Sequence, residues 1–208
     1  MTADATLVRD ALVRQWRVLA REAPSRDLES ESRVAGWRNR EVLAHLTMQP
    51  VLLARFLRTA GDEAAQVDLA QNLAGTRNLA DLVDAATREA AEAGRVDFAA
   101  TAEDAISALA NADLASTVTT LQGPILLVDY LVTRCVEAVV HGADLVPPVE
   151  PDPQALRLAA GALQHLLEAR DHSLLAEARV LPPAAWLDIA TGRTPAPTRF
   201  AGVLPLMT

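Results

Sequence analysis

The chain has 208 residues and a formal net charge of −8, with 50% apolar and 22% charged residues. These values are typical of one globular domain with a sizeable core, and they exclude a disordered chain. The negative charge and the lack of arginine–aromatic clusters argue against nucleic acid as a partner. No apolar run reaches the ~18–20 residues of a membrane-spanning helix, no signal peptide is recognisable, and the single Cys135 suits a reducing compartment. We therefore expect a cytoplasmic protein with no membrane partner.

Apolar residues at helical spacing predict two long helices in the first part of the chain. We expect them over residues 2–22 and 37–61, joined by a polar loop. Pro50 lies inside the second of these helices and predicts a kink there. The polar residues 61–76 that follow form a connection without an assigned structure.

The middle of the chain predicts further helices. Residues 79–94 form an alanine-rich amphipathic segment that ends at Gly94, a suitable C-cap. Residues 101–104 resemble a capping box before a short helix that ends near Ala110. The fourth main helix is predicted from near Gly123-Pro124 to Ala143.

The clearest boundary in the chain is the proline-rich stretch VPPVEPDP at residues 146–153. Asp152 is a candidate N-cap and Pro153 occupies the first helical position, so a fifth helix is expected to run to about Ala178. A short sixth helix is expected over residues 184–193, and the proline-punctuated tail has room for one short strand.

Four long helices before this boundary predict an all-α protein. We expect an antiparallel four-helix bundle over residues 1–145 and a short, mainly helical C-terminal extension over residues 146–208. The long connection at residues 61–78 permits a crossover, so a simple up-down topology is not required. The bundle is expected to be the stable core, with the extension covering the site.

The fourth helix carries the polar residues that could do chemistry. Asp129, Thr133, Glu137 and His141 follow one another at four-residue intervals and form one stripe. Such a stripe is usually a solvated face. The other sides of this helix are so apolar that it is expected to be buried nearly all round, where an unpaired glutamate and histidine are costly. The helix alone leaves both interpretations open.

His45, in the segment EVLAHL of the second helix, supplies a possible partner. A lone histidine on such a helix is more often a core or boundary residue. Together with Glu137 and His141, however, it gives two imidazoles and a carboxylate on helices that a bundle can bring face to face. This donor set suits zinc, iron, nickel or manganese and leaves coordination positions open.

Two segments in this order, GWRNREVLAHL (36–46) and RCVEAVVHGADL (134–145), resemble the mycothiol-dependent maleylpyruvate isomerase family of actinobacteria. That family belongs to the DinB-like superfamily of metal-binding helical bundles, and the resemblance covers most of residues 1–145. It implies a divalent metal, usually zinc, held by His45, Glu137 and His141; the donor set itself leaves nickel, iron and manganese as alternatives. It also implies mycothiol as a thiol partner and an isomerase or S-transferase reaction.

The C-terminal part resembles the family less well. AAWLDIATGR and the following FAGVLPL are similar to the closing segment of the family's second domain, which makes Arg193 a catalytic candidate as an anion contact for a carboxylate substrate. The plain alternative is an ordinary residue at a helix end. Glu41 and Asp144, each about one turn from a predicted ligand, are either supports for the histidines or surface carboxylates.

Two classes of function follow from these observations. The first is a metal-dependent enzyme that uses a low-molecular-weight thiol to isomerise or transfer a group on a small-molecule substrate. The second is a non-enzymatic module that binds a small ligand or oligomerises, with a structural or vestigial metal site. A homodimer is compatible with both.

Overall fold

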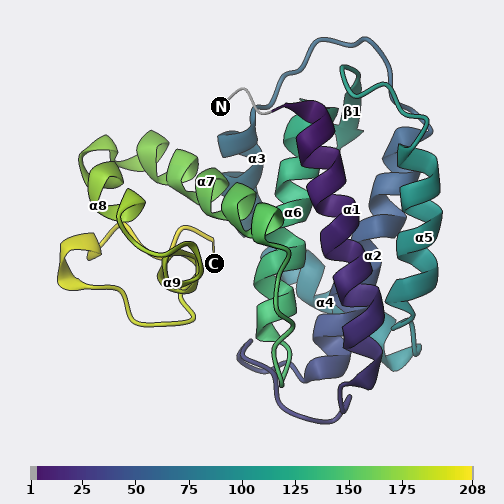
Figure 1. Cartoon of the computed structure of the whole chain (residues 1–208), viewed down its shortest axis with the longest axis horizontal. Helices are drawn as coiled ribbons and strands as arrows, with labels where there is room; N and C mark the ends of the chain where they lie inside the picture. The colour runs from purple at the N-terminus through teal and green to yellow at the C-terminus, as the bar shows by residue number, and fades with distance from the viewer. Residues whose placement is uncertain (1–3, 208) are drawn as a thin grey trace.

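The computed structural model describes residues 4–207, which form helices and one small hairpin (Figure 1). The strands β1 (Thr117–Thr120) and β2 (Gly123–Leu126) pair antiparallel. The helices are α1 (Ala5–Glu22), α2 (Asn39–Leu57), α3 (Leu69–Gly75), α4 (Ala80–Glu92), α5 (Phe98–Leu109), α6 (Leu127–Asp144), α7 (Pro153–Arg170), α8 (Leu175–Arg179) and α9 (Pro183–Ala190). The predicted all-α class is therefore confirmed, with the hairpin as a small addition.

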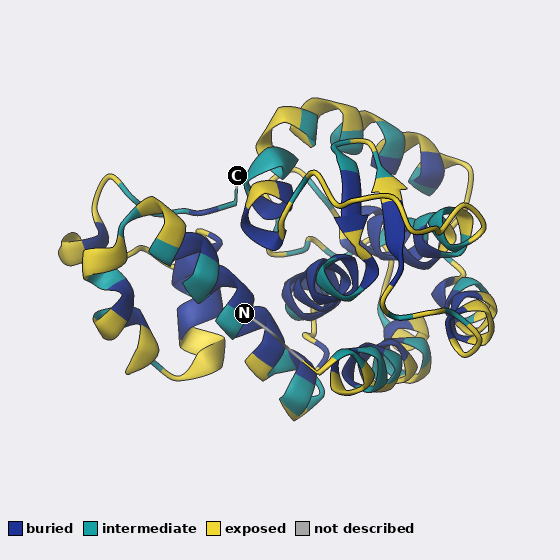
Figure 2. Ribbon diagram, turned by 90° about the horizontal axis from the view of Figure 1, so that it is seen from above, coloured by how far each residue is buried: buried dark blue, intermediate teal, exposed yellow. Residues whose placement is uncertain are grey.

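A bundle of α1, α2, α5 and α6 forms the main body of the protein. In this bundle α1 packs against α6 and α5, and α2 packs against α5 and α6. Figure 1 shows that α1 and α6 run in one direction while α2 and α5 run in the other. The connection between α2 and α5 therefore crosses over, as the long polar segment after α2 allows. Seen from above, the buried sides of these helices face one another (Figure 2).

The third helix of the bundle differs from the predicted one. The segment predicted for that place, residues 79–94, corresponds to α4, which packs on the outside of α2. α5 takes the central place because it buries large apolar side chains such as Phe98, Ile106 and Leu109, whereas α4 buries only Thr87 and Ala90. Gly94 follows the C-cap of α4 with a φ of 69°, as the C-cap prediction required.

The helix boundaries differ from the predicted ones in several places. The predicted start at Thr2 lies outside the described residues, and Asp4 caps α1 through the backbone N–H groups of Thr6 and Leu7. α2 is shorter than predicted at both ends and continues through Pro50. α5 begins at Phe98, where the side chain of Asp97 caps it, so the predicted capping box at residues 101–104 lies inside the helix.

The hairpin replaces the predicted start of the fourth helix. The segment TVTT is β-branched throughout and therefore favours an extended chain. Gly123 has a φ of 118°, which a residue with a side chain rarely adopts, and this permits the tight turn into β2. α6 consequently begins only at Leu127.

The C-terminal region also departs from the prediction. α7 ends at Arg170 instead of Ala178, because Asp171 is extended and its side chain accepts a hydrogen bond from the N–H of Ser173. In the described part of the tail, which had room for one short strand, residues 198–200 form a 3₁₀ turn and no strand is present. The predicted sixth helix is present as α9.

One apolar core extends from the bundle into the C-terminal helices. α7 crosses α6 and α1 and buries Leu163, Leu166 and Leu167, which belong to the same cluster of buried residues as the bundle. α9 packs in turn on α7, where Trp186 is fully buried. The division of the chain at residues 145 and 146 into two domains therefore stays a prediction, since packing does not stop there.

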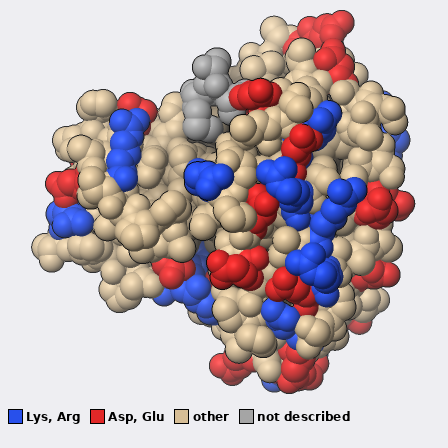
Figure 3. Space-filling view, viewed as in Figure 1, with Lys and Arg blue, Asp and Glu red and all other residues tan. Residues whose placement is uncertain are grey.

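The surface mixes charges of both signs. On the face that α1 crosses, arginine and acidic side chains lie interspersed (Figure 3). Arg14 pairs with Asp152 across the α1–α7 junction, and Arg9 pairs with the neighbouring Asp10. Within residues 4–207, no helix is both long and apolar enough to cross a bilayer.

Candidate metal centre

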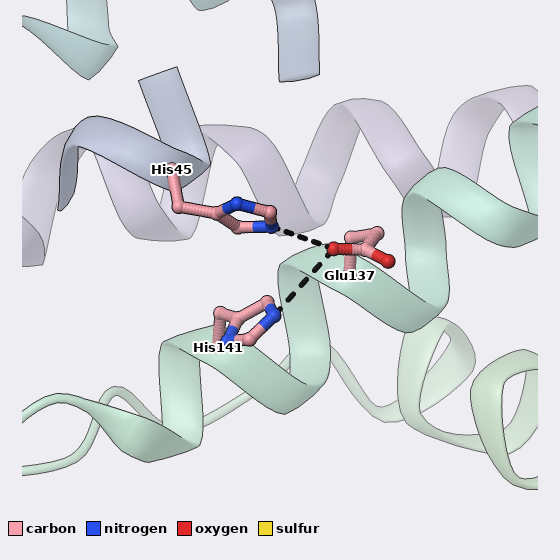
Figure 4. A group of neighbouring side chains, drawn as sticks. All are labelled: His45, Glu137 and His141. Carbon is pink, nitrogen blue, oxygen red and sulfur yellow. Dashed lines mark hydrogen bonds and ion pairs between the residues drawn. The ribbon is translucent and has the colours of Figure 1, made fainter. Parts of the chain in front are cut away.

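The candidate site lies between α2 and α6, which run antiparallel past each other. His45 comes from α2, while Glu137 and His141 come from α6, where their four-residue spacing places them on one side of the helix (Figure 4). Glu137 Oε2 lies 2.8 Å from His45 Nε2 and 3.5 Å from His141 Nε2. One potential ligand atom from each residue lies within 4.8 Å of the others. Both imidazoles therefore direct Nε2 at the same carboxylate.

The donor spacing is close to what a metal ion requires. In a tetrahedral zinc site the ligands lie ~2.0–2.1 Å from the metal, which separates them from one another by ~3.3 Å. The two distances from Glu137 Oε2 to the imidazole nitrogens lie on either side of that value. All three ligand atoms lie within 4.8 Å of one another, so His45, Glu137 and His141 can hold a divalent ion once the two imidazoles move toward it.

Gln49 is a polar neighbour of His45 that restricts the protonation of its Nε2. Its Oε1 accepts a hydrogen bond from Arg134 Nη1, which fixes the orientation of the amide, and its Nε2 lies 3.0 Å from His45 Nε2. The amide NH₂ can only donate and the carboxylate of Glu137 can only accept, so one proton on His45 Nε2 cannot satisfy both neighbours. A cation shared by His45 Nε2 and Glu137 would replace that proton in the contact with the carboxylate, but it would also occupy the lone pair to which the Gln49 amide could donate.

Asp144 and Arg193 fix the orientation of His141. Asp144 is fully buried, and its Oδ2 accepts a hydrogen bond of 2.9 Å from His141 Nδ1. The Arg193 guanidinium donates to the same carboxylate, from Nε at 3.0 Å and from Nη2 at 2.7 Å. Because its Nδ1–H is used by Asp144, a neutral His141 carries its lone pair on Nε2, which faces Glu137.

α4 forms a further wall of the site, around His45. Thr87 Oγ1 lies 3.5 Å from His45 Nδ1. Asp84 accepts a hydrogen bond of 2.7 Å from Trp37 Nε1, and the Trp37 ring lies 5.6 Å from the His45 ring and 6.2 Å from the His141 ring between centroids. This half-buried indole thus covers both imidazoles on one side.

Burial and neighbouring charges set the protonation states of the donors. Burial, together with the nearby His141, lowers the pKa of His45. Burial alone would raise the pKa of Glu137, but the hydrogen bond with His45 and the electrostatic effects of His45, His141 and Arg134 outweigh it and hold that pKa well below its usual range. Burial likewise opposes ionisation of Asp144, yet hydrogen bonds from His141 and Arg193 lower its pKa to about 2. A neutral imidazole and an ionised carboxylate are the forms that bind metal ions.

A cavity of about 390 Å³ opens beside these residues. His45, Glu137 and His141 lie in its wall, together with Trp37 and Arg193. Its volume is within the range of small-molecule sites, roughly 300–1,000 Å³. A group bound by the three donors would therefore be accessible to a small molecule.

The supporting residues divide into those that the sequence indicates and those that it does not. Asp144 supports His141, as one of the two predicted alternatives stated. Glu41 does not touch His45; its carboxylate accepts from the Arg38 backbone N–H at the start of α2 and pairs with Arg40. Gln49 and Arg134 were not singled out, although each lies about one turn from a predicted ligand on the same helix.

Fold and site together define a class of protein: a helical bundle with a His–Glu–His group between two helices at the wall of a cavity. Residues 9–146 match the family described as the mycothiol maleylpyruvate isomerase N-terminal domain, and since this is more than half of the chain, the protein belongs to that family. The resemblance carried by the two sequence motifs is therefore confirmed. No curated protein and no solved structure matches the chain. Family membership associates the protein with mycothiol-related, isomerase-like chemistry.

Proposed function

We propose that this protein binds a divalent metal ion through His45, Glu137 and His141 and catalyses a thiol-dependent isomerisation or S-transfer on a small molecule. The observation that carries the proposal is the convergence of these three donors, within 4.8 Å of one another, at the wall of a cavity. Family membership supports mycothiol as the thiol. Zinc is the proposed metal because two imidazoles and a carboxylate are a common catalytic zinc set; nickel, iron and manganese are the alternatives.

The protein's own residues bind and orient. His45 and Glu137 are held in their metal-binding protonation states, and Asp144 keeps the lone pair of His141 on Nε2. Trp37 covers the imidazoles and limits the access of water on its side. A metal ion bound there supplies Lewis-acid chemistry that lowers the pKa of a thiol and so favours the nucleophilic thiolate.

Arg193 fits a positioning role better than that of a free anion contact. Two of its nitrogens donate to Asp144 and the third donates to the Thr191 carbonyl oxygen at 2.8 Å. Its guanidinium is thus committed to the carboxylate that holds His141. We propose that Arg193 orients His141 through Asp144.

The shape of the donor group favours a catalytic or ligand-binding site over a structural one. Structural zinc is normally enclosed by four protein ligands. Within residues 4–207, no fourth His, Cys, Asp or Glu side chain joins the group of His45, Glu137 and His141. A coordination position would therefore face the cavity, which an enzyme requires and a structural site does not.

Metal content tests the first half of the proposal. Protein purified without a polyhistidine tag is reconstituted with zinc, and the metal is measured by elemental analysis. We expect about one divalent ion per chain, retained in the control His165→Ala on the surface of α7 and lost in His45→Ala and Glu137→Gln. A native protein that stays metal-free after reconstitution contradicts the proposal.

Cobalt substitution tests the thiol half. Sulfur bound to Co(II) gives an absorption band in the near ultraviolet. We expect this band when mycothiol is added to the cobalt protein, also in Cys135→Ser, and not in Glu137→Gln. If millimolar thiol leaves the spectrum unchanged while cobalt is bound, the thiol-dependent reaction is excluded and the non-enzymatic ligand-binding module takes its place.

A further inference from the structure

Arg134 is a buried cation in the wall of the same cavity. It lies three residues before Glu137 on α6, ~4.5 Å along the helix axis. Its relative exposure is only 9%, and its side chain lines the cavity. This charge helps to lower the pKa of Glu137, but the proposed metal ligands give it no contact with an opposite charge.

Every polar partner of Arg134 is neutral. Its Nε and Nη2 lie 3.2 and 3.1 Å from Thr133 Oγ1, and its Nη1 donates to Gln49 Oε1. The Tyr130 ring lies under the guanidinium, 4.6 Å from its central carbon. Among residues 4–207, no carboxylate forms an ion pair with Arg134. Among residues 4–207 these three hydrogen bonds use three of the five N–H groups of a guanidinium, and the hydroxyl of Tyr130 is a further neutral neighbour.

The other guanidinium groups at the cavity differ from Arg134. Arg193 is neutralised by Asp144, and Arg77 is exposed to solvent, where it donates to the Pro205 carbonyl oxygen. A buried cation with no carboxylate in contact is costly, because it loses hydration while Glu137, whose pKa it helps to lower, lies beyond ion-pair distance. Among the arginines in this wall, Arg134 is therefore the one that would bind an anion most favourably.

The rest of the cavity wall indicates what the anion is attached to. Away from the donors the lining is mostly apolar and comes from α2, α4, the hairpin and the tail; it includes Met48, Leu52, Phe56, Val83, Leu121 and Met207. A strongly hydrated body would lose its water against these side chains and find few hydrogen bonds in return. An apolar body would bury its surface there favourably.

We infer that the cavity binds a small carboxylate with an apolar body, held by a two-pronged contact between its carboxylate and Arg134. The planar guanidinium suits a carboxylate, and burial strengthens the pair. With the carboxylate on Arg134, the next few atoms of the molecule lie beside His45 and Glu137, one turn along α6. This inference rests on the proposed function for the chemistry at those atoms, but the binding of the carboxylate itself requires no metal.

The test compares a carboxylate with its uncharged counterpart on metal-free protein. The probes are 4-phenylbutyrate and 4-phenylbutan-1-ol, titrated by calorimetry after the metal has been removed with a chelator. Tryptophan fluorescence gives a second readout, because Trp37 lines the cavity while Trp16 and Trp186 are fully buried. We expect the carboxylate to bind at least about tenfold more tightly than the alcohol, as for a hydrogen-bonded charge pair.

Three variants assign that preference to Arg134. Arg134→Met should abolish the preference for the carboxylate while alcohol binding changes little. Arg134→Lys keeps the positive charge but lacks the planar guanidinium, so it should retain part of the preference for the carboxylate. Arg55→Met removes the same charge from an exposed position on α2 and should leave it unchanged.

Each outcome decides the inference. Equal binding of the two probes to the native protein overturns it, as does no binding of either, or an equal loss in Arg55→Met and Arg134→Met. If circular dichroism shows that Arg134→Met does not fold, a full preference in a folded Arg134→Lys also overturns it. Because the titration uses metal-free protein, failure of the metal proposal in elemental analysis leaves this result interpretable.

Discussion

The two parts of the chain build the site in different ways. The bundle, which the family match covers, supplies all three candidate donors on α2 and α6. The C-terminal helices supply no donor; they place Arg193 on Asp144, which in turn holds His141. Helix packing in the bundle thus brings the three donors together. The orientation of the His141 imidazole depends in addition on Arg193, which lies outside the bundle. One part of the chain can therefore supply the candidate ligands while another part orients one of them.

The largest expected effect comes from removing the C-terminal part. The sequence predicts that a chain ending at Val146 stays folded, but the shared core predicts the reverse, because α6 and α1 would lose the cover of α7. We expect the free energy of unfolding to fall by more than about 5 kcal/mol, a large share of the ~5–15 kcal/mol of an ordinary domain. Urea unfolding followed by circular dichroism measures this. A cooperative transition at the midpoint of the full chain would show that the bundle is an independent domain.

The second prediction concerns metal affinity when all three donors are kept but the support of His141 is removed. In Arg193→Gln, Asp144 loses its charged partner while His45, Glu137 and His141 remain. We expect metal affinity to fall by about 10–100-fold, the usual range for groups that orient a ligand. Competition with a chromophoric chelator gives the dissociation constant.

The control for this variant is Arg33→Gln. Arg33 also ties the bundle to the C-terminal part, through a contact of 3.0 Å between its side chain and Asp188. Its contact with Asp144 is made by the backbone N–H, which donates to the carbonyl oxygen at 2.9 Å and is kept in the variant, and its side chain forms no hydrogen bond with the Asp144 carboxylate. Its metal affinity should equal that of the native protein. Equal losses in the two variants would mean that general docking of the C-terminal helices, and not Arg193, supports the site.

A smaller effect compares one buried tryptophan in each part. Trp16 and Trp186 are both fully buried, but Trp186 Nε1 donates to the Ala160 carbonyl oxygen at 3.2 Å, whereas Trp16 Nε1 has no partner among residues 4–207. Replacement by phenylalanine removes a satisfied donor in one case and an unsatisfied donor in the other. We expect Trp186→Phe to lower the free energy of unfolding by about 1 kcal/mol more than Trp16→Phe. Urea titrations of both variants provide the comparison, and equal losses would contradict it.

The smallest expected effect concerns the thiol of the bundle. Cys135 is fully buried on α6, and burial raises its pKa to about 12. The thiolate form is therefore scarce in the folded protein until the pH approaches that value, whereas an unfolded thiol ionises above about pH 8.5. Iodoacetamide should leave the native protein unmodified from pH 7 to about pH 10 and label it in urea. Rapid native labelling, followed by mass spectrometry, would show that the bundle opens at α6.

The sequence predicted the donors because their signals are local. Glu137 and His141 share one helix face by spacing alone, and His45 was paired with them through the two motifs that resemble the family. Extending the same faces by one turn would also have indicated Gln49 and Arg134. The contributions of Asp84 and Thr87 could not be predicted, because they depend on how α4 packs against α2, and neither segment carries a local sign of that contact.

For the fold, too, the sequence predicted local features better than the packing of the helices. Helical periodicity indicated the long helices, but it could not rank residues 79–94 against residues 98–109, since both are amphipathic. Residues 98–109 take the centre of the bundle because they bury large side chains such as Phe98. Residues 79–94 stay outside because their buried face is formed by small residues. The capping box of Asp68 and Gln71 also indicates the start of α3, which the sequence analysis did not predict. The hairpin was missed because a four-residue β-branched run is short and Gly-Pro also commonly precedes a helix.

Because the donors come from α2 and α6, a bound ion would link two positions that lie 92 residues apart in the sequence. The unfolded chain cannot keep such distant groups together, so the ion would bind the folded state almost exclusively. Mass action then adds to the free energy of unfolding as the free metal concentration rises, by about 2.7 kcal/mol at a hundred times the dissociation constant. Metal supply would in this way set the stability of the folded protein, and melting temperatures would be comparable only at a fixed, buffered metal concentration.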